Sequence, residues 1–108
     1  MMSPESCGRS LLVDDPDIGQ LIGAFVEKLP ERLKALRDAE QRSAWLEVAN
    51  LAHQMAGAAG GYGFPEMGKF AARIEVATKG IPNPRELAHA MAAFDTLCMA
   101  AIHGHAMH

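Results

Sequence analysis

His53 is the residue whose type and surroundings first suggest chemistry. It lies in the stretch LAHQMAGAAGGYG, residues 51–63, where a helical pattern contains the glycines Gly57, Gly60 and Gly61. Histidine changes charge near neutral pH and can act as a base, a metal ligand or a nucleophile. Each glycine inside a helix costs about 1 kcal/mol relative to alanine. The glycines therefore weaken the helix beside this histidine, and this weakening needs an explanation.

Small residues surround His53 on the predicted helix. Successive helical residues are about 100° apart, so His53 lies off the apolar stripe of its helix. Its own face comprises Ala49, Asn50, Ala56 and Gly57, extended by Leu46 and Gly60. Two interpretations follow. Either another helix packs closely on the small residues and His53 is an ordinary surface histidine, or the glycines lower the surface so that a partner reaches the ring.

Residues 52–75, AHQMAGAAGGYGFPEMGKFAARIE, resemble the histidine-containing phosphotransfer (HPt) domain of bacterial phosphorelays. In that family the histidine is followed by an apolar residue, often a lysine, and then by glycine and small residues. A second glycine ends the helix, and the next helix carries an apolar residue and an apolar–acidic or apolar–amide pair. The matching positions are His53, Met55, Ala56, Gly57, Ala58, Ala59, Gly63, Met67, Ile74 and Glu75. The upstream FVEKLPERLKAL also resembles the preceding helix of the family, so the resemblance spans about residues 15–102.

The resemblance implies a phosphorelay function for His53. A receiver-domain aspartyl phosphate would donate its phosphoryl group to His53, which would pass it to an aspartate of another receiver domain. Glu75 would accept a hydrogen bond from Nδ1, fix the tautomer and leave Nε2 as the nucleophile; the alternative for Glu75 is an exposed surface glutamate. The receiver domain supplies Mg²⁺, so no cofactor of the chain's own is expected.

The implied partners are receiver domains of response regulators and of hybrid histidine kinases. Their predicted docking face is Ala49, Asn50, Ala56, Gly57 and Gly60. No glycine-rich nucleotide loop follows a strand pattern, so autonomous ATP-dependent kinase activity is not expected.

Ala56 departs from the family pattern, because a lysine that helps to hold the phosphoryl oxygens is common at this position. Lys69 or Arg73 on the next helix is a candidate substitute, and a solvated surface charge is the alternative for both. The missing lysine keeps a second function open. In that alternative the chain is a helical adaptor that docks on receiver domains or histidine kinases without carrying phosphate.

Apolar residues at steps of three and four predict the first two helices. The first starts with Asp15 as N-cap and Pro16 at the first helical position. It continues past Pro30 as one kinked helix or as two abutting helices. The second follows Ser43 as N-cap and runs to about Gly61.

Two further helices complete the prediction. The third begins near Pro65 and stops before Gly80, and the fourth has Asn83 as N-cap and Pro84 at its first position. Short connections favour antiparallel neighbours. The expected fold is all-α, an antiparallel up-down four-helix bundle.

The predicted domain organisation is a flexible lead-in over 1–13, the bundle over 14–103 and a frayed tail over 104–108. The predicted apolar stripes contain Ile18, Leu21, Ile22, Phe25, Leu29, Leu33, Leu36, Trp45, Val48, Ala52, Met55, Ala59, Tyr62, Met67, Phe70, Ala71, Ile74, Leu87, Met91, Phe94, Leu97, Cys98 and Ala101.

Two other patterns in the sequence give weaker functional predictions. LLVDDPDI looks like the first strand of a receiver domain, but the β-alternation that such a domain needs does not follow. The tail histidines His103, His105 and His108 can bind Zn²⁺, Ni²⁺ or Cu²⁺, yet they have no cysteine or carboxylate at structural-site spacing. We therefore expect no metal site, and metal binding by the tail stays a third, weaker alternative.

Composition narrows the class of protein further. The 108 residues predict one domain, and the net charge of -3 argues against nucleic-acid binding. No apolar run has the length of a membrane span, and no secretion signal is recognised. Cys7 and Cys98 match no metal or redox spacing, which fits a reducing, cytoplasmic setting. A cytoplasmic monomer is expected.

Overall fold

The computed structural model describes residues 16–106, which form four helices and no strand. These are α2 (Pro16–Gln41), α3 (Trp45–Gly61), α4 (Pro65–Thr78) and α5 (Pro84–Ala106). The predicted all-α, four-helix fold is confirmed. The predicted lead-in over 1–13, which contains Cys7, and the predicted N-cap Asp15 lie outside the described residues. α5 continues to Ala106, so residues 104–106 of the predicted frayed tail are helical; His108 lies outside the described residues.

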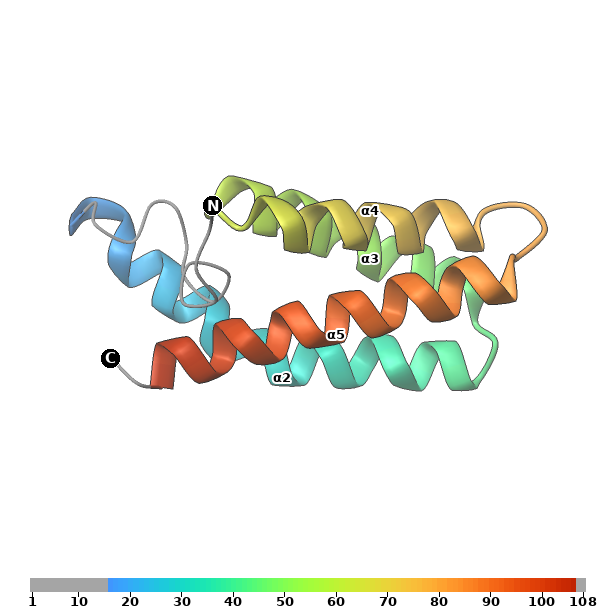
Figure 1. Cartoon of the computed structure of the whole chain (residues 1–108), viewed down its shortest axis with the longest axis horizontal. Coiled ribbons are helices and arrows are strands. Elements are labelled where there is room, and N and C mark those ends of the chain that lie inside the picture. The colour runs from blue at the N-terminus through green and yellow to red at the C-terminus, as the bar shows by residue number, and fades with distance from the viewer. Residues whose placement is uncertain (1–15, 107–108) are drawn as a thin grey trace.

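The helices pack in a ring. α2 and α4 each pack against both α3 and α5, and α3 and α4 make the most extensive contact. Figure 1 shows the α3–α4 turn at one end of the bundle and the α2–α3 and α4–α5 turns at the other. Each helix therefore turns one face inward, and apolar side chains from all four meet in one core. The largest completely buried side chains are Phe94, Leu29, Leu36, Ile74, Val48 and Cys98.

Two details of the core refine the predicted stripes. Leu21 was placed on the core stripe of α2, but it is 54% exposed because Ile22 and Phe25 occupy the inward positions beside it. Cys98 is completely buried, and this burial raises the pKa of its thiol to about 12. A thiol that does not ionise is a poor nucleophile and metal ligand, so Cys98 is a packing residue.

α2 is one continuous helix with Pro30 inside it, which decides between the two predicted forms. Proline has no N–H to donate to the carbonyl four residues earlier, and its ring crowds that carbonyl. In Figure 1 the blue N-terminal part of α2 runs in a different direction from its teal C-terminal part. This bend is the expected consequence of an internal proline.

The α2–α3 link corrects the predicted start of α3. Ala44, not Ser43, is the N-cap, and no side chain caps the helix. Ser43 has a φ of 56° and directly follows the end of α2. Its N–H donates to the carbonyl of Glu40 at 3.0 Å, and the Ala44 N–H donates to the carbonyl of Ala39 at 2.9 Å. These bonds form a Schellman motif, so Ser43 ends α2 instead of beginning α3.

Ser43→Gly is expected to raise the free energy of unfolding by about 1 kcal/mol, because a left-handed backbone strains every residue with a Cβ. Chemical denaturation measures this change. Ser43→Ala is the matched control, because it also removes the hydroxyl but keeps the Cβ, and it should bring no gain. Equal stability of the glycine and alanine variants would contradict the strain argument.

The α3–α4 turn contains Gly63, the glycine that the resemblance places at the end of the helix. Gly63 has a φ of 83°, and the Phe64 N–H donates to the carbonyl of Ala59 at 2.8 Å. The Phe25 ring of α2 lies 5.4 Å from Tyr62 and 5.8 Å from Phe64, measured between ring centroids. Aromatic contacts at this distance favour association, so they anchor the turn to α2.

The start of α5 follows the prediction. The Oδ1 atom of Asn83 accepts a hydrogen bond from the Glu86 N–H at 3.1 Å, as an N-cap does. α4 ends at Thr78, before Gly80, whose φ is 68°. Among residues 16–106, no helix is both long enough and apolar enough to cross a membrane.

Candidate functional site

His53 stands on the outer surface of α3, with its side chain 74% exposed. Leu46, Asn50, Gly57 and Gly60 follow the same line along the helix at steps of four and three, and all are exposed. Residues at this spacing share one face of a helix. The structure therefore presents His53 in the middle of an exposed stripe, which we call the His53 stripe (Leu46, Asn50, His53, Gly57 and Gly60).

Close packing of α4 on α3 brings a second helix beside His53. A Cβ at Gly68 of α4 would lie 3.2 Å from the carbonyl oxygen of Ala56 and 3.4 Å from the backbone nitrogen of Gly60. The absence of a side chain at Gly68 therefore lets the two backbones approach. Ala71 and Glu75 follow Gly68 at steps of three and four and share its face, which directs Glu75 toward α3.

Glu75 contacts the imidazole directly. Its Oε1 atom lies 3.1 Å from Nδ1 of His53, and its side chain is only 17% exposed. The pKa of the Glu75 carboxyl lies below its ordinary value, first because Lys79 hydrogen-bonds to it and then because His53 does; burial acts in the opposite direction. At neutral pH the carboxylate is therefore ionised and can only accept. The proton in this contact belongs to Nδ1, and the lone pair of a neutral ring is left on Nε2.

Lys79 is part of the same site, although the sequence did not single it out. Its Nζ atom lies 3.0 Å from Oε2 of Glu75. His53, Glu75 and Lys79 line a shallow depression of about 480 Å³. The other residues that line it are Trp45, Leu46, Ala49, Asn50, Thr78 and Gly80. The sequence feature that could have identified Lys79 is its spacing from Glu75, because charges of opposite sign four residues apart on a helix attract.

The glycines of α3 border open space. A Cβ at Gly57, Gly60 or Gly61 would meet no atom within 4 Å. Within residues 16–106, no helix occupies the space that a Cβ at these positions would take, so the close packing of α4 on α3 does not need these three glycines to lack side chains. Two alanines of the predicted docking face are less exposed than these glycines. Ala49 is buried, at 6% exposure, and Ala56 packs partly against the core.

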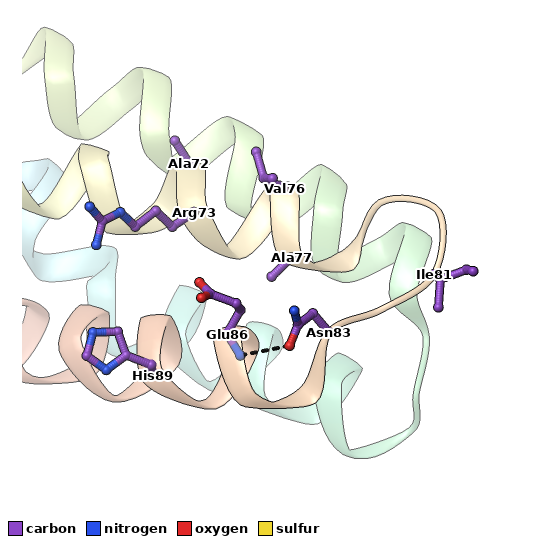
Figure 2. Close-up of a pocket in the computed structure, with 8 residues that line it drawn as sticks. All are labelled: Ala72, Arg73, Val76, Ala77, Ile81, Asn83, Glu86 and His89. Atoms are coloured by element: carbon purple, nitrogen blue, oxygen red, sulfur yellow. Dashed lines mark hydrogen bonds between the residues drawn. The ribbon is translucent and has the colours of Figure 1, made fainter.

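Lys69 and Arg73 lie away from the depression. The Lys69 ammonium is 5.8 Å and the Arg73 guanidinium 5.0 Å from the centre of the Phe70 ring. Arg73 lines a different hollow of about 740 Å³ between α4 and α5. Figure 2 shows this hollow, with Arg73 of α4 above Glu86 and His89 of α5. Both cations make cation–π contacts at the surface, and neither lines the depression beside His53.

The tail histidines do not form a cluster in the described part of the chain. Nε2 of His105 lies 3.6 Å from Oε1 of Glu27, and a Cβ at Gly23 would lie 3.3 Å from the same ring. His105 therefore packs against α2. Within residues 16–106, no three histidine, cysteine or acidic side chains gather as metal ligands would.

Comparison with known proteins gives one finding. A protein-family model described as the Hpt domain matches residues 20–102, which covers all of α3 and α4 and most of α2 and α5. No curated protein and no solved structure matches the chain.

Proposed function

The chain belongs to the Hpt domain family, which acts in histidine phosphotransfer in two-component phosphorelays, and we propose that His53 is its phosphoacceptor. The observation that carries this proposal is the pairing of His53 with Glu75. The ring is exposed, and Nδ1 is held at 3.1 Å by a carboxylate on the neighbouring helix. An oriented imidazole with a free Nε2 is the main requirement for a phosphoryl carrier, since phosphoryl transfer depends on positioning and charge stabilisation.

In the proposed reaction, Nε2 of His53 attacks the phosphorus of an aspartyl phosphate on a receiver domain. The N–P bond forms while the acyl O–P bond breaks, and the aspartate leaves as a carboxylate. The ring keeps its Nδ1 proton and becomes positively charged, so the Glu75 carboxylate stabilises the product. Transfer to a second receiver domain reverses these steps. The receiver domain brings Mg²⁺ to this reaction.

Glu75→Ala is expected to slow phosphoryl transfer about 10- to 100-fold, because the ring loses the acceptor that fixes its tautomer. Glu75→Gln should keep most of the rate, since the amide oxygen still accepts from Nδ1–H. The rate of label uptake from a phosphorylated receiver domain measures both. Glu66→Ala, which removes an exposed carboxylate from the first turn of α4, is the matched control. A Glu75→Ala rate equal to that control would argue against the orienting role.

Hpt domains act with receiver domains in general. We propose that receiver domains of response regulators and hybrid kinases dock over the His53 stripe. Its glycines leave the space beside the ring open, and Leu46, 77% exposed, supplies apolar area. We also propose that the chain is cytoplasmic and monomeric, as the sequence leads us to expect.

A phosphotransfer profile against the receiver domains of the source organism tests the function. Each purified receiver domain is phosphorylated and mixed with the chain, and the label is followed over time. We expect rapid uptake from a few receiver domains, with an acid-labile and base-stable bond located at His53 by mass spectrometry. Binding to receiver domains without label transfer would instead favour the adaptor, the alternative that Ala56 keeps open.

A further inference from the structure

Lys79 and His53 bind opposite oxygens of one carboxylate. Oε1 of Glu75 lies 3.1 Å from Nδ1 of His53, and Oε2 lies 3.0 Å from Nζ of Lys79. The terminal torsion of a glutamate is soft, so a carboxylate bound at one oxygen rotates easily. Contacts at both oxygens fix its plane. The orientation of the acceptor for His53 therefore depends on Lys79.

This arrangement differs from an ordinary ion pair on a helix surface. In such pairs both groups are solvated, and the interaction contributes little. Here the Glu75 side chain is only 17% exposed, while the Lys79 side chain is 65% exposed. The Glu75 side chain is therefore mostly covered by its neighbours, and Lys79 supplies a positive charge and a donor to its carboxylate. Lys79 is the C-cap of α4, and its N–H donates to the carbonyl of Val76 at 3.3 Å, which holds its backbone at the helix end.

We propose that Lys79 is a positioning residue for phosphotransfer, which acts by holding the Glu75 carboxylate ionised and oriented toward Nδ1 of His53. The proposal rests on His53 being the phosphoacceptor. Lys79 does not need to touch the phosphoryl group in this role. It keeps the proton on Nδ1, so that the lone pair of the neutral ring stays on Nε2.

The charge balance of the depression gives the proposal a pH signature. The titratable groups that line it are His53 from α3 and Glu75 and Lys79 from α4 and its C-terminal end. The hydrogen bond from Lys79 is the largest cause of the lowered pKa of Glu75. A lowered pKa means that the carboxylate resists protonation as the pH falls. Removal of Lys79 should therefore move the protonation of Glu75 to higher pH.

Lys79→Gln tests the proposal, with Lys69→Gln as the matched control that removes one positive charge from α4 at the Phe70 ring. Three quantities are measured: the tautomer of His53 by nitrogen NMR, the titration of the Glu75 carboxyl by carbon NMR, and the rate of transfer from a phosphorylated receiver domain. For Lys79→Gln we expect more of the Nε2–H tautomer, a higher titration midpoint and a transfer rate about three- to fivefold lower. Lys79→Arg should restore all three.

The outcomes separate this inference from the proposed function. If Lys79→Gln matches Lys69→Gln in all three quantities, Lys79 is a solvated surface charge and the inference fails. Failure of Lys79→Arg to restore the tautomer also overturns it, because that variant keeps the charge and the donor. If the wild-type chain takes no label but both NMR readouts change as expected, Lys79 does position the Glu75 carboxylate at His53, but the assignment of His53 as phosphoacceptor fails, and with it the role of Lys79 in phosphotransfer.

Discussion

His53→Gln is expected to abolish phosphoryl uptake, lowering its rate about a thousandfold or more, because glutamine offers no nucleophilic nitrogen. The fold should not change. The His53 side chain is 74% exposed, and the glutamine amide can still donate to Glu75. Substitutions at such surface positions change stability by about 0.5 kcal/mol or less. Loss of label in a variant of unchanged thermal stability therefore reports the chemistry of position 53 alone.

The assay compares His53→Gln with His89→Gln. His89 is also an exposed histidine, but it lines the separate hollow between α4 and α5 (Figure 2). Label from a phosphorylated receiver domain should disappear with the first substitution and persist with the second. Acid-labile label that persists in His53→Gln would assign the phosphoacceptor to another histidine. Wild-type signalling by a His53→Gln variant that still binds its receiver domain would favour the adaptor.

The helices could be predicted from sequence because their signals are local. Apolar residues at helical spacing, together with turn residues such as Gly63 and Asn83, predicted both ends of α3 and α4 and the start of α5 to within a residue or two. The closeness of His53 and Glu75 had a different source. These residues are 22 positions apart, and periodicity alone places them on two helices without pairing the helices. Only the resemblance to the HPt family suggested the contact.

Features that depend on tertiary geometry escaped prediction. Serine is a favoured N-cap, so Ser43 was assigned to the start of α3, but the short link needs a left-handed residue at the end of α2. Lys79 was missed because the meeting of His53, Glu75 and Lys79 depends on the packing of α4 on α3, which a sequence does not display. Gly68 was missed for a similar reason, since its role depends on how closely two helix backbones approach.

Gly57→Leu is expected to slow transfer from a receiver domain about 100-fold while leaving the fold as stable as the wild type or more stable. A Cβ at Gly57 would meet no atom within 4 Å, and leucine favours a helix by several tenths of a kcal/mol over glycine. The new side chain would stand one turn from His53, where a docked receiver domain must approach. A displacement of about 1 Å can lower an enzymatic rate about 100-fold.

Two comparisons decide whether the effect is steric. Gly61→Leu is the matched control, because Gly61 also faces open space but lies off the His53 stripe and about 12 Å along the helix from His53. It should transfer at the wild-type rate. Phosphoramidate, a small phosphoryl donor, should label Gly57→Leu as fast as the wild type, since it reaches Nε2 without docking. Normal transfer from a receiver domain to Gly57→Leu would mean that the glycines do not serve docking. A defect limited to the protein donor would instead explain why α3 keeps residues that weaken it, because the space they leave open is where the partner binds.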